Sequence, residues 1–287
     1  NNFFYILKFI LIDLNHKKIV NFNKQIYEVF MKSLKGKIVF ITGATSGIGK
    51  ACAYAFAKEG ANIIINARRL ELLNEIADDI RKKYDVKVYS FKLDVRNREE
   101  VFNSINSLPE EWKKIDILVN NAGLARGLNK FYEDNPDNWE EMIDTNVKGL
   151  LYVTYAILPG MIERKSGHII NIGSIAGHEA YPRGAVYCAT KHAVDAITKS
   201  LRMDIIDKNI LVSTIDPGLV ETNFSRVRFD GDEEKAKAVY KGLTPLTGED
   251  VADAVIFCAT RPPHVNIAQI TLLAAQQATA TIVYRKE

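Results

Sequence analysis

The side chains that could do chemistry in this sequence gather in one stretch, residues 171–191, which contains Ser174, Tyr187 and Lys191. Ser174 follows the apolar run 168–172, which predicts a buried strand with the serine at its carboxyl end. Tyr187 and Lys191 stand four residues apart in a segment of helical pattern at about 183–207, so both side chains project from one face of a helix. The stretch therefore predicts a hydroxyl, a phenol and an ammonium group at one site.

The pairing of a phenol with an ammonium group sets the chemistry that this site could perform. A free phenol has a pKa of about 10 and is a poor base at neutral pH. An ammonium about 4 Å away, at an effective dielectric near 20, favours the phenolate by roughly 4 kcal/mol, or about three pKa units before desolvation opposes it. We therefore expect Lys191 to lower the pKa of Tyr187, which would then exchange a proton with an alcohol or a carbonyl. Taken alone, the four-residue spacing is more often an ordinary pair on an amphipathic helix.

Composition excludes several functional classes. The chain has 287 residues, 47% of them hydrophobic, which is enough for a sizeable core. A net charge of +3, a pI near 8.6 and the lack of any block of basic residues argue against nucleic-acid binding. Cys52, Cys188 and Cys258 lie far apart without a CxxC motif, so neither disulfides nor a metal site is predicted. A reducing, cytoplasmic compartment follows.

The first thirty residues differ in character from the rest. Residues 3–12 are apolar but are interrupted by Lys8 and followed by Asp13. They are shorter than the roughly 20 apolar residues that span a bilayer, and they lack the flanks of a secretory signal. We expect residues 1–30 to be an N-terminal extension, residues 31–287 to be the folded domain, and no membrane association. A membrane-surface anchor is the alternative for the extension.

A glycine-rich turn begins the alternation of strands and helices. Residues 37–42 predict a buried strand and residues 50–58 a helix, with glycines between them in a GxxxGxG spacing. A strand, a glycine turn and a helix in that order let backbone N–H groups approach a pyrophosphate. The residues predicted to bind a dinucleotide here are Gly43, Ala44, Thr45, Ser46, Gly47, Ile48 and Gly49.

The end of the second predicted strand, residues 61–66, indicates which dinucleotide binds. An acidic residue about twenty positions past the glycines would hold the ribose 2′-hydroxyl of NAD, but Arg68 and Arg69 stand there instead. An arginine fork suits a 2′-phosphate, so the sequence predicts NADP. The alternative is that both arginines are solvated charges at the start of the helix 70–83.

The remaining pattern continues without a domain boundary. Further strands are predicted at 87–93, 115–119, 168–172, 210–215 and 267–273, and helices at 98–107, 136–164 and 249–259. Pro159 and Gly160 predict a kink or break in the long helix, and a loop with a short helix is expected over 223–242. The sequence thus predicts an α/β fold: a single-domain, Rossmann-like, doubly wound parallel seven-stranded sheet with helices on both faces.

From about residue 31 onward the chain resembles the short-chain dehydrogenases/reductases. The motifs that carry the resemblance occur in family order, namely residues 42–49, Asp94-Val95, residues 120–123, Asn146, Ser174, Tyr187-x-x-x-Lys191 and Pro217-Gly218. The resemblance implies catalytic roles for four residues: Tyr187 as acid/base, Ser174 orienting the carbonyl, Lys191 tuning the tyrosine and holding the ribose, and Asn146 anchoring a water that leads to Lys191.

The same resemblance extends the expected cofactor site beyond the glycine turn. It implies that Asp94 and Val95 face the adenine, that Asn121 lies on the adenosine side, and that Tyr187 and Lys191 contact the nicotinamide ribose. The loop 217–222 would contact the nicotinamide amide, through Pro217, Gly218, Val220 and Thr222.

A narrower resemblance concerns the substrate. Residues 167–174, 216–225, 227–232 and 263–267 are similar to the NADP-dependent 3-hydroxy acid dehydrogenases, which act on serine, allo-threonine or malonic semialdehyde. It implies a homotetramer that associates through the helices bearing Asn146 and Tyr187. Arg183 and Cys188 depart from the subgroup pattern, so the rim of the pocket is expected to differ.

The expected activity is hydride transfer between NADP(H) and a short 3-hydroxy acid, and two alternatives to it stay open. One alternative is a broader carbonyl reductase acting on ketones or hydroxysteroids, because catalytic residues in this fold say little about substrate. The other is a redox-sensing regulator without turnover, which the intact catalytic set argues against. With a 3-hydroxy acid as substrate, Ser174 and Tyr187 would contact its hydroxyl group and a cation its carboxylate, with Arg228 preferred over Arg226 and Arg183.

Overall fold

A computed structural model describes residues 32–286 of the chain. The predicted extension at residues 1–30 lies outside the described residues. Within 32–286, no helix combines the length and the apolar composition that crossing a membrane requires.

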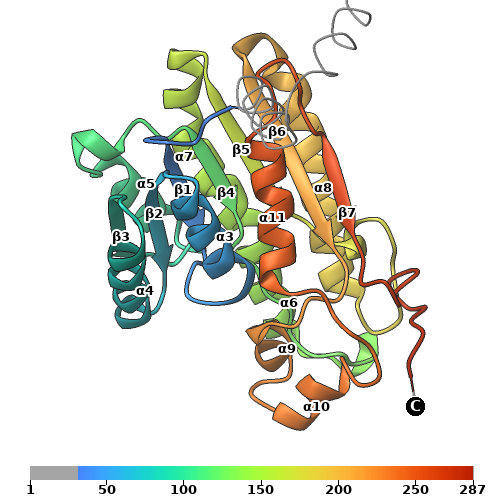
Figure 1. Ribbon diagram of the computed structural model, residues 1–287. Coiled ribbons are helices and arrows are strands. Elements are labelled where there is room, and N and C mark those ends of the chain that lie inside the picture. Colours follow the sequence, from blue (N-terminus) through green and yellow to red (C-terminus); the bar gives the residue numbers. More distant parts are fainter. Residues whose placement is uncertain (1–31, 287) are drawn as a thin grey trace, which may run out of the picture.

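The centre of the fold is one seven-stranded parallel sheet, which confirms the predicted class (Figure 1). Its order is β3-β2-β1-β4-β5-β6-β7, so the chain winds outward from β1 in both directions. The strands are β1 (Ile38–Thr42), β2 (Asn62–Ala67), β3 (Val88–Lys92), β4 (Ile117–Asn120), β5 (Gly167–Ile172), β6 (Ile210–Pro217) and β7 (Gln269–Leu272). Where the order reverses, between β1 and β4, neighbouring connections leave opposite faces and open a crevice.

Helices cover both faces of the sheet because its central strands are apolar on both sides. Successive side chains of β1 point to opposite faces of the sheet. Val39 and Ile41 pack into the core on one face, and Phe40 packs into the core on the other. The first face carries α3 (Gly47–Lys58), α4 (Leu70–Lys83) and α11 (Gly248–Ala259), and the second α5 (Arg98–Asn106), α7 (Leu150–Arg164) and α8 (Ala185–Asp204).

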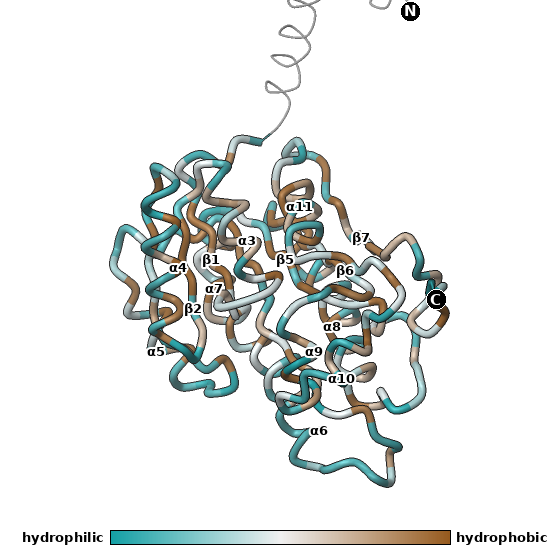
Figure 2. The backbone as a smooth tube through the Cα atoms, turned by 60° about the horizontal axis from the view of Figure 1, so that its bottom comes forward, coloured by the Kyte–Doolittle hydropathy of each residue, from teal (hydrophilic) through white to brown (hydrophobic). Residues whose placement is uncertain are grey.

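The shorter elements lie mainly between the strands and these helices. They are η1 (Glu110–Trp112), η2 (Phe131–Glu133), α6 (Pro136–Ile143), η3 (Asp144–Gly149), η4 (Ile175–Gly177), η5 (Ile206–Lys208), α9 (Asn223–Arg228) and α10 (Glu233–Ala238). In Figure 2 hydrophobic residues concentrate in the interior strands, whereas α10 is hydrophilic.

The long helix predicted at 136–164 is one continuous helical path with an unexpected irregularity. Its middle, η3, is a π-helical segment that contains Asn146. Of the kink or break predicted at Pro159 and Gly160, the break is wrong, because α7 runs through both residues. Pro159 is exposed, so the carbonyl that loses its helical donor there can be hydrated. A π segment inside an α-helical path is frequent at functional sites.

Two short helices, α9 and α10, occupy the predicted loop 223–242. They lie beneath the carboxyl ends of the strands (Figure 1). A single parallel bridge between Val220 and Leu246 ties the beginning and end of this excursion together. This segment forms a lid, residues 223–242, over the end of the sheet where parallel strands place functional side chains.

Candidate active site

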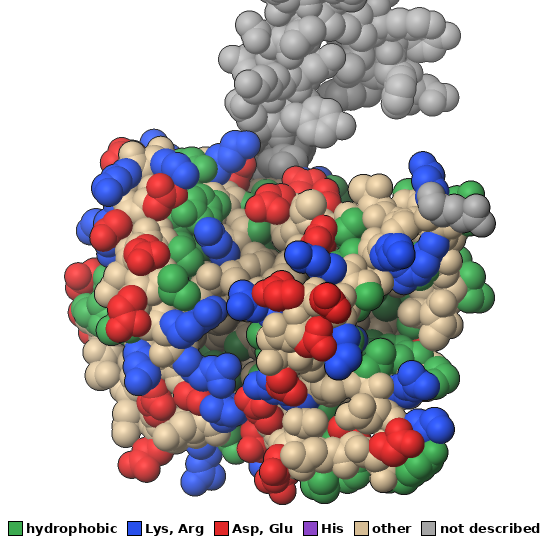
Figure 3. All heavy atoms as spheres, turned by 90° about the horizontal axis from the view of Figure 1, so that it is seen from below, with side chains coloured by type: hydrophobic (Ala, Val, Ile, Leu, Met, Phe, Trp, Pro, Cys, Tyr) green, Lys and Arg blue, Asp and Glu red, His purple; other side chains and the backbone are tan. Residues whose placement is uncertain are grey.

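A cavity of about 1280 Å³ opens at the carboxyl ends of the strands. Figure 3 shows this end of the molecule, with basic and acidic side chains interleaved around a hollow. Its lining comes from the glycine turn, the ends of β2, β3, β4 and β5, the first turn of α8, the lid and the C-terminal segment. The cavity is large enough for a dinucleotide and a small substrate together.

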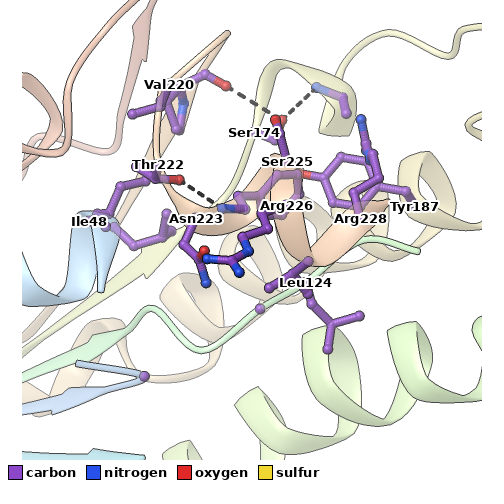
Figure 4. A pocket seen from close by; sticks show the side chains of 18 of the residues that line it. Ile48, Leu124, Ser174, Tyr187, Val220, Thr222, Asn223, Ser225, Arg226 and Arg228 are labelled. Atoms are coloured by element: carbon purple, nitrogen blue, oxygen red, sulfur yellow. Dashed lines mark hydrogen bonds between the residues drawn. The ribbon is translucent and has the colours of Figure 1, made fainter. Parts of the chain in front are cut away.

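Ser174 is held at the end of β5 by a local turn. Its Oγ accepts a hydrogen bond from the N–H of Ala176 at 3.1 Å and so caps η4. The same Oγ donates a hydrogen bond to the carbonyl of Pro217 at 3.4 Å. The side chain is buried. One hydroxyl thus links the β5 turn to the loop after β6 and points into the cavity (Figure 4).

Tyr187 lies in the first turn of α8 with its ring between two lid side chains. The ring of Phe224 is 5.7 Å away in an edge-on arrangement, and the Arg228 guanidinium lies 5.0 Å from the ring centre. Burial, with a smaller contribution from Tyr181, raises the pKa of Tyr187 to about 12, while Arg228 and a hydrogen bond from Ser174 oppose the rise. At neutral pH the phenol therefore keeps its proton and can donate it to a carbonyl oxygen.

Lys191 is a buried cation one helical turn from Tyr187. Its Nζ donates to the carbonyl of Ile172 at 2.9 Å and lies 6.0 Å from the Tyr187 ring centre. Burial lowers the pKa of Lys191 to about 8, and the charge of Asp216 opposes this fall. The expected lowering of the Tyr187 pKa by Lys191 is not found in this structure: the causes that act on the phenol do not include Lys191, and burial raises the pKa instead.

Asn146 is buried in η3 and fixes the loop after β4. Its Oδ1 accepts from the N–H of Leu124 at 2.8 Å, and its Nδ2 donates to the carbonyl of Leu124 at 2.8 Å and to Thr190 Oγ1 at 3.0 Å. A Cβ on Gly123 would lie 3.3 Å from Asn146 Oδ1 and 3.8 Å from Lys191 Nζ, so Gly123 keeps the approach between them free. The water relay from Asn146 to Lys191 stays a prediction.

The glycine turn has the conformation that a pyrophosphate site requires. Gly43 and Gly47 have φ of +68° and +53°, which favours glycine. Helix α3 begins at Gly47, earlier than predicted, and Ser46 makes no side-chain cap, so the first backbone N–H groups of the helix are available to an anion. The residues present fit a dinucleotide phosphate.

Asn121 explains the third glycine of the turn. Its Nδ2 donates to the carbonyls of Thr42 and Gly43, and a Cβ on Gly49 would lie 2.3 Å from that nitrogen. Gly49 and the fully buried Ala44 therefore lie behind the cavity wall. The other residues predicted to bind cofactor line the cavity: Gly43, Thr45, Ser46, Gly47, Ile48, Arg68, Arg69, Asp94, Val95, Asn121, Tyr187, Lys191, Pro217, Gly218, Val220 and Thr222.

The predicted 2′-phosphate arginines lie at the edge of the cavity. Arg69 Nη2 donates to Thr45 Oγ1 at 3.1 Å, and Arg68 Nη1 is 3.7 Å from Glu141 Oε1. Arg96, which our sequence analysis missed, also lines the cavity and forks onto Asp94 at 2.6 and 2.9 Å. The signal was present, because Arg96 follows the Asp94-Val95 motif directly.

Of the three candidate cations for a substrate carboxylate, the structure brings only Arg228 to Tyr187 (Figure 4). Its Nη2 donates to the Tyr181 hydroxyl at 3.2 Å, and its Nε is buried without a hydrogen-bond partner among the described residues. Arg226 lines the cavity but is exposed and pairs with Glu233, and Arg183 is exposed and lines a small neighbouring cavity to which Tyr187 and Arg228 also contribute. Tyr181 and Phe224 also line the site, and our sequence analysis did not select them.

Comparison with known proteins agrees with this geometry. Residues 37–233 match the family model described as short chain dehydrogenase. The NADP-dependent 3-hydroxy acid dehydrogenase of Schizosaccharomyces pombe is 46% identical over 258 residues, covering 90% of this chain and 100% of that protein. The Salmonella typhi protein named NADP-dependent 3-hydroxy acid dehydrogenase YdfG is 47% identical over 244 residues, covering 85% and 97%.

A solved structure of a related protein has the same fold. The closed form of serine dehydrogenase complexed with NADP+ superposes with a TM-score of 0.82 at 45% identity, covering 87% of this chain and 100% of that one.

The buried charge of Lys191 generates a prediction about stability. Its pKa is about 8 in the folded chain against an ordinary 10.5, so between these pH values the unfolded chain binds more protons and the parent gains stability as pH rises. Lys191→Met should therefore be more stable than the parent at pH 7, by up to roughly 3 kcal/mol, and this advantage should vanish by about pH 10.5.

Chemical denaturation at pH 7, 9 and 10.5, at one protein concentration, measures this difference. Lys148→Met, which removes an exposed lysine paired with Asp144, is the control and should stay within about 0.5 kcal/mol of the parent. A Lys191→Met variant that is less stable than the parent at pH 7 would contradict the predicted cost of the buried charge.

Proposed function

The chain belongs to the short-chain dehydrogenase family, and we propose that it transfers a hydride between NADP(H) and a short 3-hydroxy acid. As a member it is an NADP-dependent oxidoreductase that acts on a hydroxyl-bearing carbon. The proposed substrates are L-serine, L-allo-threonine, or 3-hydroxypropionate with malonic semialdehyde as its oxidised partner. The observation that carries the substrate class is Arg228, a guanidinium beside the Tyr187 ring with a buried Nε that lacks a partner among the described residues.

In this proposal the four catalytic side chains have different tasks. Tyr187 gives its proton to the carbonyl oxygen in reduction and takes it back in oxidation. Ser174 orients the same oxygen, Lys191 holds the ribose and balances charge near the phenol, and Asn146 fixes the loop that borders them. When bound, NADPH would supply the hydride in reduction and NADP+ would accept it in oxidation.

The cofactor residues are assigned from their positions in the cavity. The glycine turn and the N-terminus of α3 would hold the pyrophosphate, and Arg68, Arg69 and Arg96 lie where a 2′-phosphate would need positive charge. Asp94 and Val95 border the adenine end and the loop 217–222 the nicotinamide end. Asp94 is engaged by Arg96, so it would contact the adenine without a free carboxylate.

Assembly and compartment complete the proposal. We infer a homotetramer that associates through α7 and α8, where Leu151, Tyr155 and Met203 are exposed apolar side chains. The three cysteines are buried and unpaired, which suits a reducing cytoplasm. The domain would comprise residues 31–287.

The first prediction from this assignment concerns the phenol. Tyr187→Phe removes the proton while keeping the ring that packs on Phe224, so NADP binding should be retained and turnover should fall by about 10²- to 10⁴-fold. Steady-state kinetics and NADPH fluorescence titration measure the two properties. Turnover within tenfold of the parent would exclude Tyr187 as the acid/base.

The second prediction concerns the choice of cofactor. A charge-assisted contact to the 2′-phosphate contributes about 1.5–3 kcal/mol, so the parent should prefer NADP over NAD in kcat/KM by at least about tenfold. Replacing Arg68 and Arg69 together with alanine should remove most of this preference and leave the NAD rate nearly unchanged. Replacing the exposed Lys58 and Lys82 together with alanine removes the same two positive charges outside the cavity lining and controls for net charge. An unchanged preference would move the phosphate contact to Arg96.

The third prediction tests the substrate class. Arg228→Ala should raise the KM for L-serine or 3-hydroxypropionate by about 10- to 100-fold, the effect of losing one charge-assisted contact. The KM for an uncharged alcohol of similar size should change far less, and Arg228→Lys should lie between the two because it keeps the charge without the fork. If the parent uses the uncharged alcohol as well as the acid, a broader carbonyl reductase is the better assignment.

A further inference from the structure

The side chain of Arg126 connects three separate parts of the chain. It follows β4 in the loop that begins at Asn121 and lines the cavity. Its Nε donates to Glu141 Oε2 of α6 at 2.6 Å, and its Nη1 donates to the carbonyl of Val227 and to Asp230 Oδ1, both at 2.8 Å. One guanidinium therefore bonds α6 and the lid together.

The hydrogen bonds between this loop and the lid all lie at or just beyond the carboxyl end of α9. Besides Arg126, the N–H of Gly127 donates to the carbonyl of Arg228 at 2.8 Å. The last carbonyls of a helix have no partners within it, and here the loop supplies donors for two of them. Immediately beyond, Asp230 and Gly231 have positive φ and turn the chain away. The backbone on both sides of the Arg228 side chain is thus fixed from the loop after β4.

Arg228 depends on this backbone anchoring because its side chain has little else to hold it. Its one hydrogen bond to a neighbouring side chain among the described residues is the 3.2 Å contact with Tyr181. Its guanidinium lies 5.0 and 5.3 Å from the ring centres of Tyr187 and Phe224. A shift at the end of α9 would move the cation away from Tyr187.

Glu141 keeps Arg126 in place from the other side. Its carboxylate also lies 3.2 Å from Arg96 Nη1 and 3.7 Å from Arg68 Nη1, and only a fifth of the side chain is exposed. The hydrogen bond from Arg126 is the main cause that lowers the pKa of Glu141, so the carboxylate is charged at neutral pH. The Glu141 carboxylate therefore interacts with Arg68 and Arg96 on the cofactor side and also with Arg126, which bonds to the lid.

We propose that Arg126 is a positioning residue: anchored by Glu141, it fastens the end of α9 and so places the Arg228 guanidinium beside Tyr187 for the substrate carboxylate. This inference rests on the substrate-binding role proposed above for Arg228. Arg126 contacts neither the phenol nor the reacting carbon. Its effect on the reaction is through the position of Arg228.

Hydrogen–deuterium exchange of the 287-residue chain tests whether Arg126 fastens the end of α9. Arg126→Met should accelerate amide exchange in residues 225–232 at least tenfold and leave α11 unchanged. Lys235→Ala, which removes an exposed ion pair with Asp232 from the same lid, should leave residues 225–232 at the parent rate. Unchanged exchange in Arg126→Met, or equal acceleration in the Lys235→Ala control, would overturn the proposal.

A double-mutant cycle tests whether Arg126 acts through Arg228. Arg126→Met should raise the KM for the 3-hydroxy acid at least fivefold in the parent, with a smaller change in kcat, and less than twofold in the Arg228→Ala background. The same factor in both backgrounds would show that Arg126 acts by another route and overturn the proposal. If Arg126→Met does not fold, Arg126→Lys serves in both measurements, with a smaller expected effect because lysine lacks the fork.

The two proposals can fail separately. If the parent does not distinguish the acid from an uncharged alcohol, the proposed substrate class fails, while the exchange experiment still decides whether Arg126 fastens the lid. If the parent makes that distinction and exchange in residues 225–232 does not respond to Arg126→Met, the substrate class stands and the fastening fails.

Discussion

The burial of one cation, Lys191, is the constraint on which the rest of this site depends. An ammonium group removed from water is costly unless polar groups replace its hydration. Here the carbonyl of Ile172 accepts a hydrogen bond from the ammonium group, and the buried Asp216 provides opposite charge nearby. The backbone has little room beside them, since a Cβ on Gly173 would lie 1.9 Å from Asp216 Oδ1 and one on Gly177 would lie 2.8 Å from the Lys191 carbonyl. Gly173 is thus required by the buried Asp216 side chain, and Gly177 by the close approach of the α8 backbone at Lys191.

Two halves of the cavity are held by different interactions. On the cofactor side, Thr42 and Asn121 bind backbone groups of the β1 and β4 turns, and both turns continue directly from fully buried strands. On the substrate side, α9 and α10 have six residues each and depend on ion pairs and caps for their position. Such a segment is expected at the low end of local stability, which suits a part that must admit and release substrate.

Arginines concentrate positive charge in the cavity, which the small net charge of the whole chain does not indicate. The net charge is only +3, yet Arg68, Arg69, Arg96, Arg126 and Arg228 all line this one cavity. Acidic side chains fix some of them: Asp94 holds Arg96, and Glu141 and Asp230 hold Arg126. Among the described residues, the guanidinium groups of Arg69 and Arg228 donate only to hydroxyl groups, which leaves their charge for an anion. The pattern suits a site for a phosphorylated dinucleotide and a carboxylate.

The sequence by itself determined the fold and the grouping of Ser174, Tyr187 and Lys191 at one site. Apolar runs and helical periodicity identified all seven strands, and Ser174, Tyr187 and Lys191 lie together as their spacing predicted, because spacing within one helix or at a strand end is a local property. Only the tertiary structure decided how these groups interact. The pKa of Tyr187 is raised, since burial depends on Phe224 and the lid from 37 residues along the chain, which no local spacing encodes. Likewise, the choice of Arg228 over Arg226 and Arg183, and the contact of Arg126 with Glu141 and Asp230, depend on how the loops meet at the edge of the sheet.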